Sequence, residues 1–320
     1  MNKITFPRKD FEGNWWSQKD IEKWFCNSVL TKLSKKLSSI KTTNIIEKKT
    51  LRIITNHLYL VLIAPPQRLE LWTEIFDKYR ANISDTFIKN IRKAFNYDNF
   101  RKNILVDLAK ILNVKSCPYC NMHYTLYAEE ITKKSIKVER LAKFQYDHFF
   151  DKCKYPMLSM SLYNLIPSCS TCNHGKSTTK LTLSFNPYYS DISKQFKFEL
   201  NNPINLYIGA KANDLIDVNF IATDSNKQSD LDDFINTFHL KALYQRHGDI
   251  AQEAFDKVYQ SPYYSNPDNF RWLSNTNPDY IKRLWLGTYT NENEIEKRPM
   301  TKFIQDLNEQ AQMLKLSEKD

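Results

Sequence analysis

The sequence predicts an α+β fold with a helical N-terminal region (1–113), a cysteine-bearing core (114–186) and a mixed α/β C-terminal region (187–320). Two observations predict this class. Apolar residues recur at helical spacing in the first region, and short β-prone runs separated by turn-rich segments follow it. The 320 residues are 42% hydrophobic and 13% aromatic, which suffices for a packed core and argues against global disorder.

Helices are expected where apolar residues recur every three or four positions. Ser17 to Asp20 form a helix-start signal ahead of Ile21, Trp24 and Phe25, which recur at that spacing. The same periodicity predicts further helices at 69–79, 104–114, 231–259 and 300–314.

Strands are expected in short runs of aromatic and β-branched residues that are bounded by turn residues. In the core, the runs at 124–127 and 144–149 fit this description. In the C-terminal region, two further strands are expected at 196–200 and 203–208. The core should therefore be built around short strands that follow a helical region.

The positive charge of the chain is concentrated near its N-terminus. The formal net charge is +10, and residues 1–116 hold 22 Lys and Arg against 11 Asp and Glu. A basic region of this kind favours a polyanionic partner such as nucleic acid. The alternative is a solvated basic face that only aids solubility.

Several classes of protein are disfavoured by what the sequence lacks. The N-terminus has no apolar segment or cleavage site typical of a signal peptide. The longest apolar stretch, 58–64, is far shorter than the roughly 20 residues of a membrane-spanning helix. We therefore expect a cytoplasmic protein with no membrane contact. The five glycines are too far apart for a P-loop or a dinucleotide-binding fingerprint.

Four of the six cysteines form two Cys-x-x-Cys pairs, Cys117 with Cys120 and Cys169 with Cys172. Disulfides are rare in the cytosol, and each pair can present two thiolates to one tetrahedral ion from a single turn. The spacing predicts a structural Zn²⁺ site formed by all four. The alternatives are four unrelated buried cysteines or a redox pair.

Other residues of the ligand types are expected to play ordinary parts. His123 follows Cys120 closely and could replace a ligand, but four cysteines already suffice. The remaining cysteines, which match no motif, are Cys26 and Cys153.

A cluster of polar residues lies between and after the cysteine pairs. Asp147-His148 ends a strand-like run, Asn164 precedes an apolar-proline step, and Asn173-His-Gly-Lys176 follows the last cysteine. Over residues 117–177 this pattern resembles the motif of HNH (ββα-metal) nucleases, in the branch that carries a four-cysteine zinc site. The resemblance implies a ββα-metal nuclease core and phosphodiester hydrolysis.

The chemistry of phosphodiester cleavage suits the first two residues. The reaction needs an attacking water, a base and stabilisation of negative charge. His148 is the candidate general base, because a neutral imidazole near pH 7 can accept the proton of water. The carboxylate of Asp147 suits a hard catalytic ion, Mg²⁺ or Mn²⁺.

The resemblance assigns parts to four further residues. Asn173 stands where the family has its last catalytic metal ligand, so the pattern reads His-Asn-Asn. The nuclease domain of RNA-guided CRISPR effectors has the same variant. Asn164 matches the residue that braces the loop holding the catalytic histidine. Lys176 and His174 lie where they could contact phosphate of the substrate.

Residues 238–249 and 297–306 give a looser resemblance to HNH subunits of Septu-type bacterial antiviral defence systems. Such subunits work beside an ATPase. This resemblance implies an effector of antiphage defence with an ATPase partner subunit.

The sequence thus predicts a metal-dependent HNH endonuclease with DNA as the expected substrate. Two alternatives remain open. One is a non-catalytic zinc module that binds nucleic acid or a protein, and it would not need Asp147, His148 and Asn173 together. The other is an HNH nuclease that acts on RNA, because these residues contact the backbone and read little sequence.

Overall fold

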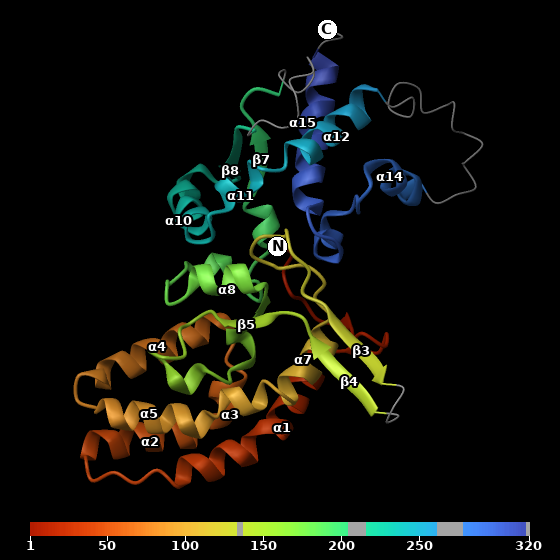
Figure 1. Cartoon of the computed structure of the whole chain (residues 1–320). Coiled ribbons are helices and arrows are strands. Elements are labelled where there is room, and N and C mark those ends of the chain that lie inside the picture. Colours follow the sequence, from red (N-terminus) through yellow and green to blue (C-terminus); the bar gives the residue numbers. More distant parts are fainter. Residues whose placement is uncertain (133–136, 204–215, 261–277, 318–320) are drawn as a thin grey trace. The chain divides into compact units, whose positions relative to one another are not determined.

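The computed structural model of the chain (Figure 1) describes residues 1–132, 137–203, 216–260 and 278–317. Helices dominate these residues and small antiparallel sheets accompany them, so the predicted α+β class is confirmed.

The chain divides into two compact units. The N-terminal unit comprises Lys3–Lys115 and Thr125–Ser190. The C-terminal unit comprises Met1–Asn2, Ser116–Tyr124 and Asp191–Asp320.

Much of the N-terminal unit is a series of helices that bury their apolar faces against one another. On α5, for example, Phe87, Ile88, Ile91 and Phe95 are buried, which leaves a polar face free for other contacts. The helices of this series are α1 (Gln18–Ser38), α2 (Ile45–Asn56), α3 (Leu58–Leu62), α4 (Pro66–Arg80), α5 (Asp85–Phe95), α6 (Tyr97–Phe100) and α7 (Ile104–Leu112).

The predicted helix start at Ser17 is confirmed. The Ser17 side chain accepts a hydrogen bond from the backbone of Asp20, and the Asp20 side chain accepts one from the backbone of Ser17. This reciprocal capping box satisfies two donors that a helix otherwise leaves without partners. The helices predicted at 69–79 and 104–114 correspond to α4 and α7, and α7 ends before Asn113, whose φ is 43°.

The rest of the N-terminal unit contains short antiparallel sheets. In the one that matters most here, β5 pairs with β6 so that Asp147 lies opposite Ile166 and His148 opposite Leu165. Helix α8 follows β6 directly and packs on β5 (Figure 1). The elements are β1 (Arg8–Lys9), β2 (Trp15–Trp16), β3 (Tyr127–Thr132), β4 (Lys137–Ala142), β5 (Gln145–His148), β6 (Leu165–Ser168), α8 (Ser170–Lys176) and the 3₁₀ helices η1 (Pro156–Leu158), η2 (Leu162–Asn164) and η3 (Leu183–Phe185).

The C-terminal unit has its own core, which is rich in aromatic rings. The rings of Phe198, Tyr244 and Phe303 contact one another, with centroid distances of 4.4 to 5.1 Å. The elements around this core are β7 (Phe196–Leu200), β8 (Val218–Ala222), α10 (Gln228–Phe238), α11 (Leu240–Tyr244), α12 (Gly248–Tyr259), α14 (Pro278–Leu286), α15 (Thr301–Ser317) and the 3₁₀ helices η4 (Ile192–Lys194), η5 (Ser225–Lys227) and η7 (Glu292–Lys297).

Several predicted elements can be compared with these bounds. Strand β7 has the predicted bounds 196–200, and β5 lies within 144–149. The single helix predicted at 231–259 is divided into α10, α11 and α12: His239, in a left-handed conformation with φ of 52°, separates α10 from α11, and a second break precedes Gly248. The helix predicted at 300–314 is α15. Of the strand predicted at 203–208, residues 204–208 lie outside the described residues.

The predicted regions 1–113, 114–186 and 187–320 differ from the way the chain packs. Most of the first two regions lies together in the N-terminal unit. The physical reason is side-chain contact: the Tyr146 hydroxyl donates to the Leu105 carbonyl, and the Ser161 hydroxyl donates to the Val61 carbonyl. Among the described helices, none has the length and apolar character needed to cross a membrane.

Candidate functional site

Strand β5 directs its side chains to two different environments. Successive residues of a strand point to opposite faces. Gln145 and Asp147 form hydrogen bonds with side chains of α8. Tyr146 and His148 instead face the helical region, where Tyr146 reaches Leu105 of α7. Asp147 and His148 therefore lie on opposite faces of the same strand end.

His148 is buried, with 7% of its surface exposed. Its Nε2 lies 3.0 Å from the backbone oxygen of Ser159, and its ring packs against the ring of Tyr97 at 4.5 Å. A carbonyl oxygen only accepts, so Nε2 carries the hydrogen in this contact and Nδ1 of the neutral ring is left as the acceptor.

The surroundings of His148 keep its imidazole neutral. Burial is the main cause that lowers the pKa of His148, to about 3, and the positive charge of Lys152 acts in the same direction. The hydrogen bond to Ser159 opposes this effect. A neutral imidazole is the form that can accept a proton.

Asp147 is also buried, and it forms an ion pair inside the protein. Its Oδ1 lies 3.3 Å from Nζ of Lys176, which also donates to the backbone oxygen of His148 at 2.8 Å. Lys176 itself is fully buried. The expected contact of Lys176 with phosphate does not fit this position, because the ammonium is engaged within the core and not offered to solvent.

Asn173 and His174 lie on α8, close to where the chain leaves the cysteine pair. Asn173 is half-buried, and its amide nitrogen donates to the side-chain oxygen of Gln145 on β5. Asn173 and Lys176 are three residues apart on one face of α8, and Gln145 and Asp147 share one face of β5. His174 is exposed and could meet a phosphate.

Asn164 fastens the loop that connects β5 with β6. Its Oδ1 accepts from the Phe150 amide at 2.7 Å, and its Nδ2 donates to the carbonyls of Phe150 and Leu158 at 3.1 and 2.9 Å. The side chain is fully buried. The loop that begins directly after His148 is therefore tied to the start of β6.

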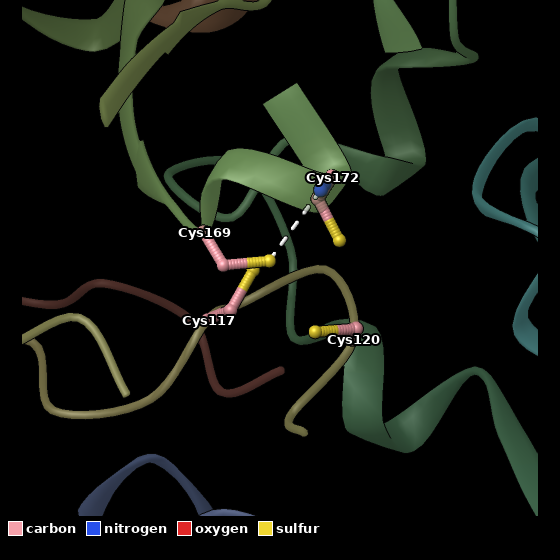
Figure 2. A group of neighbouring side chains, drawn as sticks. All are labelled: Cys117, Cys120, Cys169 and Cys172. Carbon is pink, nitrogen blue, oxygen red and sulfur yellow. Dashed lines mark hydrogen bonds between the residues drawn. The ribbon is translucent and has the colours of Figure 1, made fainter. Parts of the chain in front are cut away.

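The four cysteines of the two Cys-x-x-Cys pairs come together (Figure 2). Their sulfur atoms all lie within 4.8 Å of one another, and all four residues are buried. A tetrahedral Zn²⁺ with Zn–S bonds of about 2.3 Å needs sulfur atoms about 3.8 Å apart. Four buried cysteines at these separations could hold a metal ion, and the cluster is compatible with zinc. The residues are Cys117, Cys120, Cys169 and Cys172.

Backbone amides point at two of these sulfur atoms. The Cys172 amide donates to Sγ of Cys169, and the Met122 amide donates to Sγ of Cys120, both at 3.4 Å. Such contacts suit thiolates, which carry negative charge. Nδ1 of His123 lies 3.7 Å from Sγ of Cys120, so this histidine neighbours the cluster and is not needed as a fifth ligand.

A second cation at Asp147 would have fewer protein ligands. Within the part of the chain that the structure describes, the four cysteines are the one group in which three or more His, Cys, Asp or Glu side chains lie close enough to hold an ion. Asp147 does not belong to such a group. Asp147 offers a carboxylate, and Asn173 offers an amide oxygen. Mg²⁺ is commonly bound by one or two such groups, with water and substrate phosphate completing its shell. Oxygen donors of these types suit Mg²⁺ or Mn²⁺, while the Asp147 carboxylate is itself buried and paired with Lys176.

Sequence reasoning missed several residues around the site. Gln145, the partner of Asn173, could have been found, since it lies two residues before Asp147 and so on the same face. Ser159 acts through its backbone oxygen, which no side-chain pattern reveals. Tyr97 belongs to a distant part of the sequence, and Lys152 carries no motif.

Comparison with protein-family models, with curated proteins and with solved structures finds no match to this chain.

Proposed function

We propose that this chain is a metal-dependent endonuclease of the HNH class that hydrolyses phosphodiester bonds, with DNA as the substrate. One observation carries the proposal. A buried neutral histidine, His148, ends a strand that carries the carboxylate of Asp147 on its opposite face, in a strand-strand-helix element whose loop is fastened by Asn164. The four-cysteine cluster at the start of the same helix supports it.

His148 would act as the general base. With its Nε2 hydrogen held by the Ser159 oxygen, its Nδ1 can take the proton of an attacking water. Asn164 keeps the loop after His148 in place, and Lys176 keeps the Asp147 carboxylate in its position. A bound Mg²⁺ or Mn²⁺ would supply stabilisation of negative charge on the phosphate and the leaving oxygen.

The cysteine cluster would hold a structural Zn²⁺. Its four ligands leave no open coordination position, which is typical of structural and not of catalytic zinc. The metal would fix the start of α8, where Cys169 and Cys172 lie ahead of Asn173. A cytoplasmic setting remains a prediction from the N-terminus and the short apolar stretches of the sequence, and an ATPase partner in antiphage defence remains one from the sequence resemblance.

The test is a cleavage assay on supercoiled plasmid DNA with the full chain, purified without chelator. We expect cleavage with Mg²⁺ or Mn²⁺, its loss on brief exposure to EDTA that leaves the zinc in place, and its return when excess Mg²⁺ is restored. His148→Ala should lower the rate by about two to four orders of magnitude. The matched control is His57→Ala, which replaces an exposed histidine at the end of α2.

Two outcomes would point to the alternatives. A chain that cleaves RNA and not DNA would keep the chemistry but change the substrate. Wild-type rates in His148→Ala, under conditions where EDTA stops the reaction, would refute the mechanism. A wild type inactive on both nucleic acids, with its zinc retained, would favour the non-catalytic zinc module.

A further inference from the structure

A pocket of about 530 Å³ lies in the N-terminal unit beside His148 and is lined by four positively charged side chains. Its volume falls in the usual range of ligand sites, about 300–1,000 Å³. We call it the basic pocket. Its cations are Lys89, Arg92, Lys93 and Lys152, and its other lining residues are Asn96, Tyr97, Asp98 and Ser159.

Three of the cations come from one face of helix α5. Lys89, Arg92 and Lys93 are spaced three and four residues apart, so they share a side of the helix. All three are exposed. The opposite face of α5 is apolar and buried, which fixes the direction in which the three side chains project.

The carboxylate that acts on these cations is that of Asp98, whose negative charge is felt by Lys152. Within the described residues, no carboxylate forms an ion pair with any of the four. Other cations of the same unit do have one: Arg80 pairs with Asp85, Lys110 with Glu12, and Lys154 with Asp77. Among the described residues that line the pocket, Asp98 is the acidic one, so the cations there outnumber the carboxylates.

The basic pocket reaches the candidate catalytic histidine. Nζ of Lys152 lies 4.2 Å from the centre of the Tyr97 ring, and the same ring packs against His148 at 4.5 Å. The Ser159 oxygen that accepts from His148 belongs to a residue that lines the pocket. Lys152 lies four residues after His148, in the loop that Asn164 fastens.

From this geometry we infer that the basic pocket binds the phosphodiester backbone of a nucleic acid and guides it to His148. The inference rests on the proposed function and adds a substrate-binding surface outside the strand-strand-helix element. Lys89, Arg92 and Lys93 hold phosphates along α5, and Lys152 holds the phosphate nearest to His148. The contacts are to phosphate, so they carry little sequence preference.

The test measures binding without cleavage. A fluorescein-labelled duplex DNA is titrated with the full chain in buffer that lacks Mg²⁺ and Mn²⁺, and its anisotropy is followed at several salt concentrations. The triple variant Lys89→Gln, Arg92→Gln, Lys93→Gln should bind at least about tenfold more weakly. The slope of log affinity against log salt concentration should become less negative by roughly 2 to 3, since each lost phosphate contact accounts for about 0.9 of that slope.

Two control variants make the result specific. The first control is a triple variant that removes the same charge from exposed positions on α1 and α2: Lys32→Gln, Lys35→Gln, Lys48→Gln. It should bind nearly as the wild type does. Lys89→Arg, Arg92→Lys, Lys93→Arg keeps the charge and should also retain binding, which excludes damage to α5 as the cause. Thermal unfolding should be similar in all of them.

The outcomes separate this inference from the proposed function. If the α5 triple variant and the α1/α2 control lost DNA affinity equally, the DNA would be attracted by the overall charge of the unit. That result would overturn the inference that the basic pocket binds it. Unchanged binding in the α5 triple variant, or no binding of duplex by the wild type, would also overturn it. If His148→Ala still abolishes cleavage in those cases, the nuclease proposal stands. If the pocket binds DNA but the chain cleaves no nucleic acid, the pocket stands and the nuclease proposal fails.

Discussion

Nζ of Lys176 lies 3.3 Å from Oδ1 of Asp147, and both side chains are buried. The ion pair links the end of α8 to β5, next to the candidate general base. Breaking a buried ion pair by removing one partner leaves an uncompensated charge in the core. Lys176 is therefore expected to matter for the integrity of the site even though it does not face solvent.

Lys176→Met should destabilise the protein by about 3–5 kcal/mol, because it leaves the Asp147 carboxylate buried without its cation. Urea unfolding followed by circular dichroism would measure the change. The double variant Asp147→Asn, Lys176→Met should recover part of the loss, since neither charge remains. Lys180→Met is the control, because Lys180 is exposed and forms only a surface pair with Glu70. It should cost no more than about 1 kcal/mol. Equal stabilities of Lys176→Met and Lys180→Met would contradict this account.

Asn164→Ala should loosen the loop after His148. It leaves the buried amide and carbonyl of Phe150 without their side-chain partner, at a cost of about 1–3 kcal/mol for each group. Cleavage should fall less than in His148→Ala, because Asn164 positions the loop and does not react. A stability of Asn164→Ala equal to that of the wild type would show that these bonds do not brace the loop.

The cysteines should differ sharply in their reaction with iodoacetamide. Cys153 is exposed and should react quickly in the native protein. Cys26 is buried, and its pKa is raised to about 11, mainly by burial, so it should be inert. The four clustered cysteines should be protected by a bound metal and should become reactive after treatment with a chelator. Mass spectrometry would count the modified thiols.

Elemental analysis of the same samples should find about one zinc per chain. Cys117→Ser should lose this zinc and unfold, since structural zinc contributes about 10 kcal/mol or more. Cys153→Ser should retain both zinc and fold. Folded, metal-free wild-type protein whose clustered thiols react without a chelator would rule out the zinc site.

Local features of the fold could be predicted from the sequence, because local chemistry determines them. The helix start at Ser17 depends on atoms three residues apart, and β7 follows a simple alternation of buried and exposed residues. The breaks at His239 and before Gly248 could not be predicted in this way. The apolar periodicity continues across them, while the backbone takes a left-handed turn at His239.

In the candidate site, too, the features set by local sequence could be predicted and those set by tertiary packing could not. The cysteine pairs identified their cluster, since two short spacings suffice to bring four thiols to one ion. The expectation that Lys176 contacts phosphate did not anticipate its burial, because its partners Asp147 and the His148 carbonyl lie nearly 30 residues away in the sequence. The contact of Tyr97 with His148 joins residues far apart in the sequence, and only tertiary packing brings them together.

The last prediction separates the base from the metal ligands by the response to Mn²⁺. Asn173→Ala removes an amide oxygen that would bind the catalytic ion, so higher Mn²⁺ should restore much of the lost rate. Its half-saturating Mn²⁺ concentration should rise about tenfold or more. His148→Ala should keep the wild-type Mn²⁺ dependence but reach a maximal rate lower by about two to four orders of magnitude. Gln145→Ala, which removes only the partner of Asn173, should shift the Mn²⁺ dependence in the same direction by a smaller factor. The measurement is the cleavage rate of plasmid DNA across a Mn²⁺ titration. If Mn²⁺ rescued His148→Ala as well as Asn173→Ala, the base would have to be sought in another residue.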